Sequence, residues 1–303
     1  MYFSLIITYR NEGEQVYKTC LSFLEHCQKE MFEFIVVNDA SNDGYDYSEL
    51  NKIPNLTYIE NKDRKGVGGS RDIGAMKAKG KYLFILDGHM RVFNDVLQKI
   101  IEIISNYPTE TLFCCQSLPI KIENGKPMIN YHPKSRGCQI KTAMNMNFLE
   151  YEWDTLRNSD LSNVLPIQCV MGAAYIINRD YYIYLHGLNG LQQYGMDEQF
   201  LSAKVFMNGG KIYLLKDIGV AHFYRNSNAS IPYKNIPLCK ILNKLIILYL
   251  LDENLFHKYA SLFHSNSIFN VFLELKPHID KEKTYLNLIL NKHTFIEYIT
   301  WKI

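Results

Sequence analysis

Residues 82–89 read YLFILDGH, which is five apolar or aromatic residues followed by an aspartate, a glycine and a histidine. A short apolar run of this kind is typical of a strand buried on both faces, as strands of parallel sheets are. Comparable runs occur at residues 3–8, 34–38 and 56–60. Apolar residues at helical spacing occur at 14–26, 69–78 and 94–105. This alternation predicts an α/β fold with a mostly parallel central sheet flanked by helices.

The pattern continues less regularly after residue 110. We expect strands at 112–117, 170–177 and 211–215, and helices from Arg179 and at 197–207. Residues 118–165 contain Pro119, Pro127 and Pro133, which favours an inserted hairpin and loops. Residues 236–303 carry Leu, Ile, Phe and Tyr at three- and four-residue steps. We therefore expect one α/β domain at 1–230, with halves at 1–115 and 116–230, and a C-terminal helical extension at 231–303.

The composition excludes several classes of protein. The 303 residues include 33 Lys and Arg against 31 Asp and Glu, a net charge of +2, so bulk charge does not favour nucleic-acid binding. The 47% hydrophobic share is that of a globular chain. Seven cysteines, with Cys114 and Cys115 adjacent, predict reduced thiols rather than a disulfide framework. Because the first residues read as a strand and not as a signal peptide, we expect a cytoplasmic protein.

Polar residues follow three of the expected strands directly. They form the stretches TYRNE at 8–12, NDASNDG at 38–44 and DGH at 87–89. Open α/β sheets bind ligands at the carboxyl ends of their strands. We therefore expect these stretches to converge on one crevice.

Asp87 and His89 are two residues apart, so their side chains project to the same side of an extended segment. A carboxylate and an imidazole together suit manganese better than calcium. The alternative is a turn in which Asp87 caps the backbone and His89 lies on the surface, and an isolated pair favours that alternative. Likewise, His222 taken alone reads as a core residue.

These motifs are not isolated. The order NDASNDG, RKGVGGSRDIGA at 64–75 and DGH closely resembles the nucleotide-binding half of GT-A fold glycosyltransferases. It is most similar to glycosyltransferase family 2 and the related polypeptide N-acetylgalactosaminyltransferases, which use Asp-x-His. The order continues with MGAAYII at 171–177, LHGL at 185–188, YGMDE at 194–198, GGKI at 209–212 and AHFYR at 221–225. The resemblance covers residues 3–225 and implies the Rossmann-like GT-A fold.

The resemblance assigns roles position by position. Nucleotide-sugar binding would fall to Thr8, Arg10, Glu12, Asp39, Asp43, Arg64, Gly68, Arg71, Asp87, Gly88, Gly172 and Ala173. A manganese or magnesium ion would bind to Asp87, His89 and His222, and catalysis would involve Asp197, Glu198 and Arg225. The first half of the domain would hold the donor and the second half the acceptor.

Several of these roles have alternatives. Asp39 would bond the uracil edge, and Thr8, Arg10 and Glu12 would line the base and ribose pocket, but Asp43 fits a turn cap equally well. Arg64 and Arg71 would neutralise phosphate or anchor an acidic loop. Gly172 and Ala173 would leave room for the sugar or simply pack in a strand. The pair Asp197 and Glu198 would face the acceptor, as a base or a substrate-holding group, or would only stabilise a helix start.

The resemblance implies a metal-dependent glycosyltransferase that uses a nucleotide diphosphate sugar, a UDP-sugar above all. Its hydroxyl acceptor would be a glycan, a peptide or a lipid-linked molecule. The alternative is a non-catalytic nucleotide-sugar-binding module of the same fold. YGMDE departs from the polypeptide enzymes, which carry a Trp and a second Gly there, so stereochemistry stays open. A dinucleotide-dependent oxidoreductase is disfavoured because no Gly-x-Gly-x-x-Gly follows the first strand.

Three features lie outside these motifs. Trp153 is a core residue or a platform for stacking a sugar, and we favour the core. The C-terminal helices are expected to pack on the catalytic domain or on a second copy of the chain. A basic face at Lys240 and Lys244 offers the alternative of peripheral contact with the inner membrane face. The apolar stretch at 241–251 is too short for a span, which needs roughly 20 residues.

Overall fold

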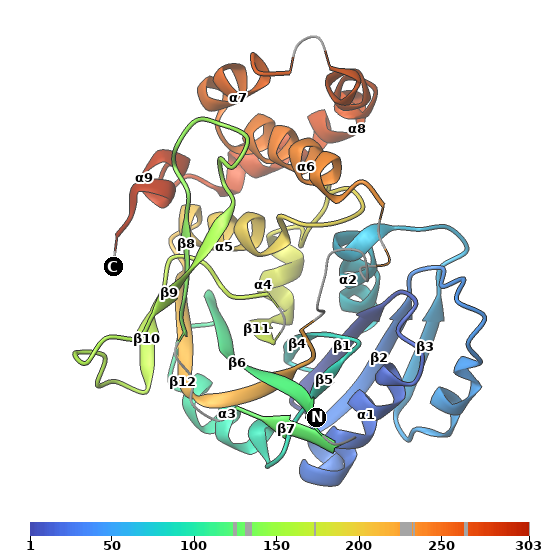
Figure 1. Ribbon diagram of the computed structural model, residues 1–303. Coiled ribbons are helices and arrows are strands. Elements are labelled where there is room, and N and C mark those ends of the chain that lie inside the picture. Colours follow the sequence, from blue (N-terminus) through green and yellow to red (C-terminus); the bar gives the residue numbers. More distant parts are fainter. Residues whose placement is uncertain are drawn as a thin grey trace.

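The computed structural model describes residues 1–123, 126–130, 135–172, 174–224, 232, 234–263 and 266–302 (Figure 1). Its central sheet contains four parallel strands in the spatial order β3-β2-β1-β4. These strands are β1 (Phe3–Tyr9), β2 (Phe32–Asn38), β3 (Leu56–Glu60) and β4 (Tyr82–Asp87). The helices between them are α1 (Gln15–His26) and α2 (Gly66–Lys77), with short 3-10 turns η1 (Lys29–Met31) and η2 (Tyr47–Lys52). The predicted α/β fold is confirmed.

The burial of the strands follows from the two layers of helices around the sheet. Leu5 and Ile7 of β1 pack in the core on the side of α1 and α3 (Val96–Ile104), whereas Ile6 packs in the core on the side of α2. One strand differs from its prediction. β3 was expected to be buried on both faces, but Thr57 and Glu60 are exposed because β3 is the last strand on its side of the sheet.

The other side of the sheet is mixed. β4 pairs antiparallel with β11 (Tyr175–Asn178), which pairs antiparallel with β6 (Thr111–Glu123). β6 runs parallel to β12 (Lys211–His222), and β10 (Val164–Pro166) closes this side. β6 and β12 are longer than predicted, and the register of β12 shifts between Leu215 and Gly219. The apolar run predicted at 170–177 forms a strand only from Tyr175 onward.

The irregular region contains the expected hairpin and loops. The end of β6 pairs with β7 (Lys126–Ile129), and β8 (Ser135–Ile140) pairs with β9 (Tyr151–Thr155) in a separate two-stranded sheet. Two helices follow, α4 (Arg179–Tyr184) and α5 (Asp197–Met207). α5 has the predicted bounds. All seven cysteines are free thiols, as predicted.

The C-terminal extension is helical. Its helices are α6 (Ile236–Leu251), α7 (Glu253–Ala260), α8 (Ser267–Ile289) and α9 (Phe295–Thr300). Figure 1 shows α6, α7 and α8 gathered at one end of the molecule. Leu245 and Ile246 of α6 belong to the same hydrophobic core as Phe200 and Leu201 of α5, so the extension packs on the α/β domain. Within the described ranges, no helix has the length and apolarity required to cross a bilayer.

Candidate active site

A crevice of about 330 Å³ opens at the carboxyl ends of β1 and β4. One wall, which we call the cluster wall, consists of lining residues from 8–12 and 87–89 together with His222. The opposite wall, the loop wall, consists of Tyr151, Trp153, lining residues from 194–199, and Lys240. The predicted residues that line the crevice are Thr8, Arg10, Glu12, Arg71, Asp87, Gly88, His89, Gly172, Asp197, Glu198 and His222.

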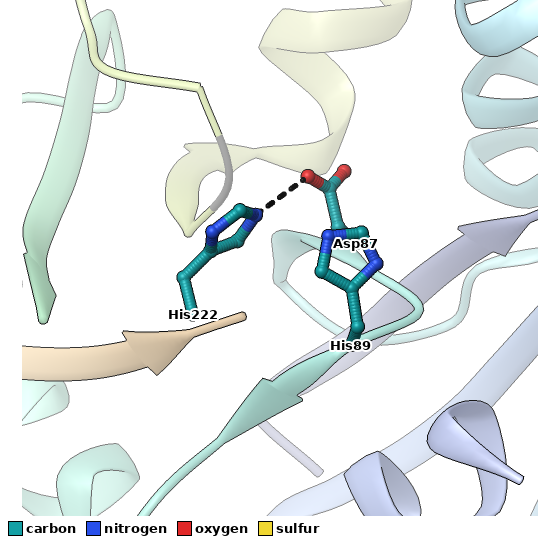
Figure 2. Close-up of side chains that lie close together, drawn as sticks. All are labelled: Asp87, His89 and His222. Atoms are coloured by element: carbon teal, nitrogen blue, oxygen red, sulfur yellow. Dashed lines mark ion pairs between the residues drawn. The ribbon is translucent and has the colours of Figure 1, made fainter. Parts of the chain in front are cut away.

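Strand pairing explains how His222 reaches Asp87 and His89. The short strand β5 (Met90–Arg91) follows His89 and pairs antiparallel with the end of β12, with Met90 opposite His222. As a result, one ligand atom from each of Asp87, His89 and His222 lies within 4.8 Å of the other two. Nε2 of His222 lies 3.5 Å from Oδ2 of Asp87, and Figure 2 marks this ion pair with a dashed line.

Gly88 allows this turn to sit against β1 and α1. A Cβ atom at position 88 would lie 2.8 Å from Cβ of Tyr9, which is closer than real Cβ contacts. A side chain there would therefore push the turn and its two flanking residues outward. The glycine is a geometric requirement of the cluster.

The three side chains fit a divalent metal. One carboxylate and two imidazoles are ligands that manganese and related ions accept. Nδ1 of His89 lies 3.1 Å from a carboxylate oxygen of Glu12. In Figure 2 the other ring nitrogen of His89 lies on the side of Asp87 and His222. The contact with Glu12 lacks hydrogen-bond geometry, because Nδ1 of His89 has no hydrogen-bond partner among the described residues, so Glu12 is a close acidic neighbour of the ring.

The protonation of the cluster suits metal binding. Burial would raise the pKa of Asp87, but the hydrogen bond with His222 and the charge of Arg71 outweigh it and hold the pKa well below its ordinary value. Burial lowers the pKa of His222, although the bond with Asp87 opposes this shift. An ionised carboxylate and a neutral imidazole are the forms that bind a cation.

Arg71 connects the two walls. Its side chain is 2% exposed and donates to Oδ1 of Asp87 at 3.1 Å and to the hydroxyl of Tyr175 at 3.0 Å. It also forms an ion pair with Asp197 at the start of α5. Of the two predicted roles, phosphate binding or anchoring of acidic residues, these contacts correspond to anchoring.

The two acidic residues of α5 have different surroundings. The carboxylate of Asp197 is paired with Arg71, whereas that of Glu198 lies beside Gly172. A Cβ at position 172 would come within 2.8 Å of Oε1 of Glu198, so the glycine makes room for this carboxylate. Burial raises the pKa of Glu198, although the charge of Arg71 opposes the shift. Glu198 is therefore the better candidate for a group that accepts a proton.

Four predicted residues lie outside the lining of the crevice. The carboxylate of Asp39 is buried and accepts bonds from the backbone N–H groups of Lys65 at 2.7 Å and Gly66 at 3.0 Å, at the start of α2. Its contact with uracil stays a prediction. Gly68 faces Leu188 and Leu191 rather than the crevice. Arg64, just before α2, does not line the crevice either.

Asp43 lies in an exposed turn next to the crevice. Its carboxylate accepts bonds from the hydroxyl of Tyr47 at 2.7 Å and from the backbone N–H of Tyr45 at 3.3 Å. These contacts correspond to the turn-capping alternative. The residue also lines a neighbouring hollow of about 540 Å³. Ala173 and Arg225, the remaining predicted residues, lie outside the described part of the chain.

Arg10 donates hydrogen bonds to the loop that follows β2. Its guanidinium donates to the carbonyl of Asp39 at 2.7 Å, to that of Ala40, and to Oδ1 of Asn42 at 3.0 Å. The side chain is nevertheless part of the crevice wall. Arg10 thus joins the ends of β1 and β2.

Two of our interpretations were wrong. Trp153, which we expected in the core, is 45% exposed and lines the crevice, because β9 pairs with β8 in a sheet separate from the main one and has no fully buried residue. Lys244, which the alternative placed on a basic face, is 1% exposed and pairs with Glu150 at 2.8 Å. Lys240 contacts the same carboxylate at 3.0 Å and lines the crevice. The two lysines therefore face the protein and do not form a basic surface.

Other residues, to which the sequence motifs assigned no role, also line the crevice. These are Tyr9, Val67, Tyr151, Tyr194, Gly195, Met196, Gln199, Tyr224, Pro232 and Lys240. Tyr9 and Tyr194 lie inside the stretches TYRNE and YGMDE, so their positions in the sequence were a usable signal. Lys240 gave no such signal, because it reaches the crevice only through the packing of α6.

Comparisons with known proteins agree with this geometry. The model of the family described as "Glycosyl transferase family 2" matches residues 4–186. Human polypeptide N-acetylgalactosaminyltransferase 14 is 26% identical over 239 residues, which are 74% of this chain and 41% of that protein. Rat polypeptide N-acetylgalactosaminyltransferase 10 is 26% identical over 253 residues, 76% of this chain and 38% of that protein. The chain thus spans about two fifths of the length of these relatives.

Solved structures share the fold. The crystal structure of GalNAc-T7 with UDP, GalNAc and Mn²⁺ aligns with a TM-score of 0.78 and 20% identity, over 99% of this chain and 56% of that chain. Staphylococcus aureus TarS 1–349 in complex with UDP-GlcNAc aligns with a TM-score of 0.50 and 17% identity, over 99% of this chain and 82% of that chain. At these identities the likeness concerns the fold, which is the predicted GT-A arrangement. Since the family model matches more than half of the residues, the chain belongs to glycosyl transferase family 2.

Proposed function

We propose that this protein is a metal-dependent glycosyltransferase that moves a sugar from a UDP-sugar to a hydroxyl group of an acceptor. The observation that carries the proposal is the cluster of Asp87, His89 and His222 at the ends of β4 and β12, with Glu198 on the opposite wall of the same crevice. A nucleotide-sugar-binding module needs no carboxylate of raised pKa on the opposite wall.

The proposed donor is a UDP-linked N-acetylhexosamine. Support comes from the relatives named as polypeptide N-acetylgalactosaminyltransferases and from fold neighbours crystallised with UDP and GalNAc or with UDP-GlcNAc. The proposed metal is Mn²⁺ or Mg²⁺, held by Asp87, His89 and His222. When bound, such an ion offsets the negative charge that develops on a departing diphosphate.

The chain's own residues then have distinct tasks. Arg71 holds Asp87 and Asp197 in place, and Glu12 places a negative charge beside the ring of His89. Glu198 takes the proton from the acceptor hydroxyl, because its carboxylate faces the crevice and burial raises its pKa. Trp153, Tyr151 and Tyr194 offer apolar ring surface against which a sugar stacks. The acceptor is a glycan, a peptide or a lipid-linked molecule.

The test is a donor screen. The full chain is incubated with a set of UDP-sugars and Mn²⁺, with and without candidate acceptors, and released UDP is measured. We expect release from one UDP-N-acetylhexosamine and its loss on addition of a chelator. A matched control is Glu102→Gln, an exposed change on α3, which should leave release unchanged. Binding of UDP without release from any donor would contradict the proposal and favour the binding-module alternative.

A further inference from the structure

The segment just before the acidic residues of α5 has an unusual backbone. Gln193, Gly195 and Met196 have φ angles of 49°, 90° and 74°, in the left-handed region. Non-glycine residues adopt this region only at an energetic cost, so their neighbours must hold them there. Residues 192–196, which we call the entry loop, are followed directly by Asp197 and Glu198. Its conformation therefore decides where both carboxylates lie.

The side chain of Asn243 holds the entry loop from helix α6. Its Oδ1 accepts from the backbone N–H of Gln192 at 2.7 Å, and its Nδ2 donates to the carbonyls of Gln192 and Gly195, both at 2.8 Å. A weaker contact at 3.3 Å reaches the carbonyl of Tyr194. One amide thus binds the loop at both ends.

The amide of Asn243 is buried among apolar side chains, and the entry loop supplies its hydrogen-bond partners. Asn243 is fully buried, and its helix neighbours Leu242 and Leu245 belong to the hydrophobic core. A buried amide costs free energy unless its donors and acceptor are satisfied. Here the backbone of the entry loop satisfies them. Only a side chain with both an acceptor and an NH₂ donor can make this set of bonds.

Further contacts hold the same region. The backbone N–H of Val67 donates to the carbonyl of Gln193 at 2.8 Å, so the loop also rests on the start of α2. One turn before Asn243, Lys240 pairs with Glu150, the residue that precedes Tyr151 of the loop wall. Helix α6 therefore reaches both segments of the loop wall.

We propose that Asn243 is a positioning residue for the transfer reaction, and that helix α6 makes the C-terminal extension a working part of the active site. This inference rests on the proposed function. Asn243 does not line the crevice. It acts through the entry loop, which sets Asp197 against Arg71 and Glu198 toward the cluster wall. A displacement of about 1 Å at a reacting group can cost on the order of 100-fold in rate.

The experiment compares two variants of the full chain. Asn243→Asp keeps the shape and the acceptor but places a carboxylate against the loop carbonyls. Leu248→Ala removes a fully buried apolar side chain from the same helix and serves as the stability-matched control. Both are assayed well below their Tm. We expect kcat for UDP release to acceptor to fall about 10- to 100-fold in Asn243→Asp, with unchanged affinity for UDP and Mn²⁺, and to stay near the starting value in Leu248→Ala.

A second readout does not depend on turnover. Backbone hydrogen exchange at 192–198 should accelerate in Asn243→Asp and not in Leu248→Ala. If Asn243→Asp does not fold, Asn243→Ser, whose shorter hydroxyl side chain cannot replace all of the amide's bonds, should give a loss of kcat and the same exchange pattern. Equal kcat losses in the aspartate and Leu248 variants, or unchanged exchange at 192–198, would overturn the proposal. Absence of turnover in the unmodified chain would contradict the proposed function instead, and the exchange measurement would still decide the role of Asn243.

Discussion

The cluster wall and the loop wall of the crevice face each other but are held by different kinds of bonds. The backbone that carries Asp87, His89 and His222 is held by strand pairing, because β4, β5 and β12 are all strands of the main sheet, and Arg71 then orients the side chain of Asp87. In the loop wall, backbone pairing of β9 with β8 is joined by side chains, namely Asn243 on the entry loop and Lys240 and Lys244 on Glu150. Backbone pairing tolerates substitution of the side chains it presents. We therefore expect substitutions in the cluster wall to remove metal ligands without moving the backbone. Substitutions in the loop wall should instead displace the residues that line the crevice.

The largest effect is expected from Asp87→Asn, which keeps the size of the side chain and removes the charged metal ligand. We expect Mn²⁺ binding to be lost and UDP release to fall by more than about 100-fold, because even residues behind a metal ligand cost 10- to 100-fold. Calorimetric titration with Mn²⁺ and the UDP-release assay measure the two quantities. Unaltered Mn²⁺ affinity would show that the ion, if any, binds elsewhere.

Glu198→Gln tests the chemistry of the loop wall. If the carboxylate takes the acceptor proton, kcat should fall by about 10²- to 10⁴-fold while Mn²⁺ and UDP bind as before. The base works when deprotonated, so the rate falls as the pH drops through its pKa. Since burial raises the pKa of Glu198 above 4.5, this acidic limb should lie at higher pH than for an exposed carboxylate. The limb should disappear in the variant, as a pH profile of kcat would show.

A different result would redefine the role of Glu198. An increase in the KM for acceptor with an unchanged kcat would mean that the carboxylate holds the substrate. The catalytic groups would then all lie on the cluster wall, and the loop wall would only bind the substrate.

Glu12→Gln should have a smaller effect within the cluster wall. Its carboxylate lies 3.1 Å from Nδ1 of His89, so the amide removes a negative charge beside a ring that would bind the cation. We expect Mn²⁺ affinity to fall by about 10- to 100-fold. Glu14→Gln is the control, because Glu14 is exposed and pairs only with Lys18 among the ion pairs of the described residues. Equal Mn²⁺ affinities in the two variants would remove Glu12 from the site.

The smallest effect is expected from Trp153→Ala on the loop wall. Stacking of a sugar on an exposed aromatic ring contributes about 1 kcal/mol of binding free energy. Its loss should raise the KM for the acceptor or donor by about five-fold. kcat and Mn²⁺ affinity should not change, and Trp153→Phe should recover most of the loss. A fall in kcat with constant KM would show that Trp153 acts on the geometry of the loop wall.

Much of the cluster wall could be predicted because its residues follow apolar runs directly. Thr8, Arg10, Glu12, Asp87 and His89 are placed by the direction of β1 and β4 alone. His222 was harder, since its approach requires the shift in β12 and the pairing with β5. The resemblance suggested this contact, and local periodicity did not.

The loop wall was predicted only in part. Asp197 and Glu198 were recognised at the start of a helix. Nothing in the sequence around them showed that Asp197 pairs with Arg71 whereas Glu198 lies beside Gly172. Arg71 and Asp197 are 126 residues apart in sequence. Trp153 was misplaced because the sequence does not show that β9 pairs only with β8 among the described strands and leaves its side chains largely exposed.

The sequence by itself determined the parallel strands, the helices that cover them and the polar residues at the strand ends. These depend on local periodicity, which records which side of each element is buried. The tertiary structure decided which carboxylate Arg71 pairs, how Asn243 binds the entry loop and which way Lys244 and Trp153 face. Those outcomes depend on bonds between distant segments, whose partners are chosen only when the elements pack together.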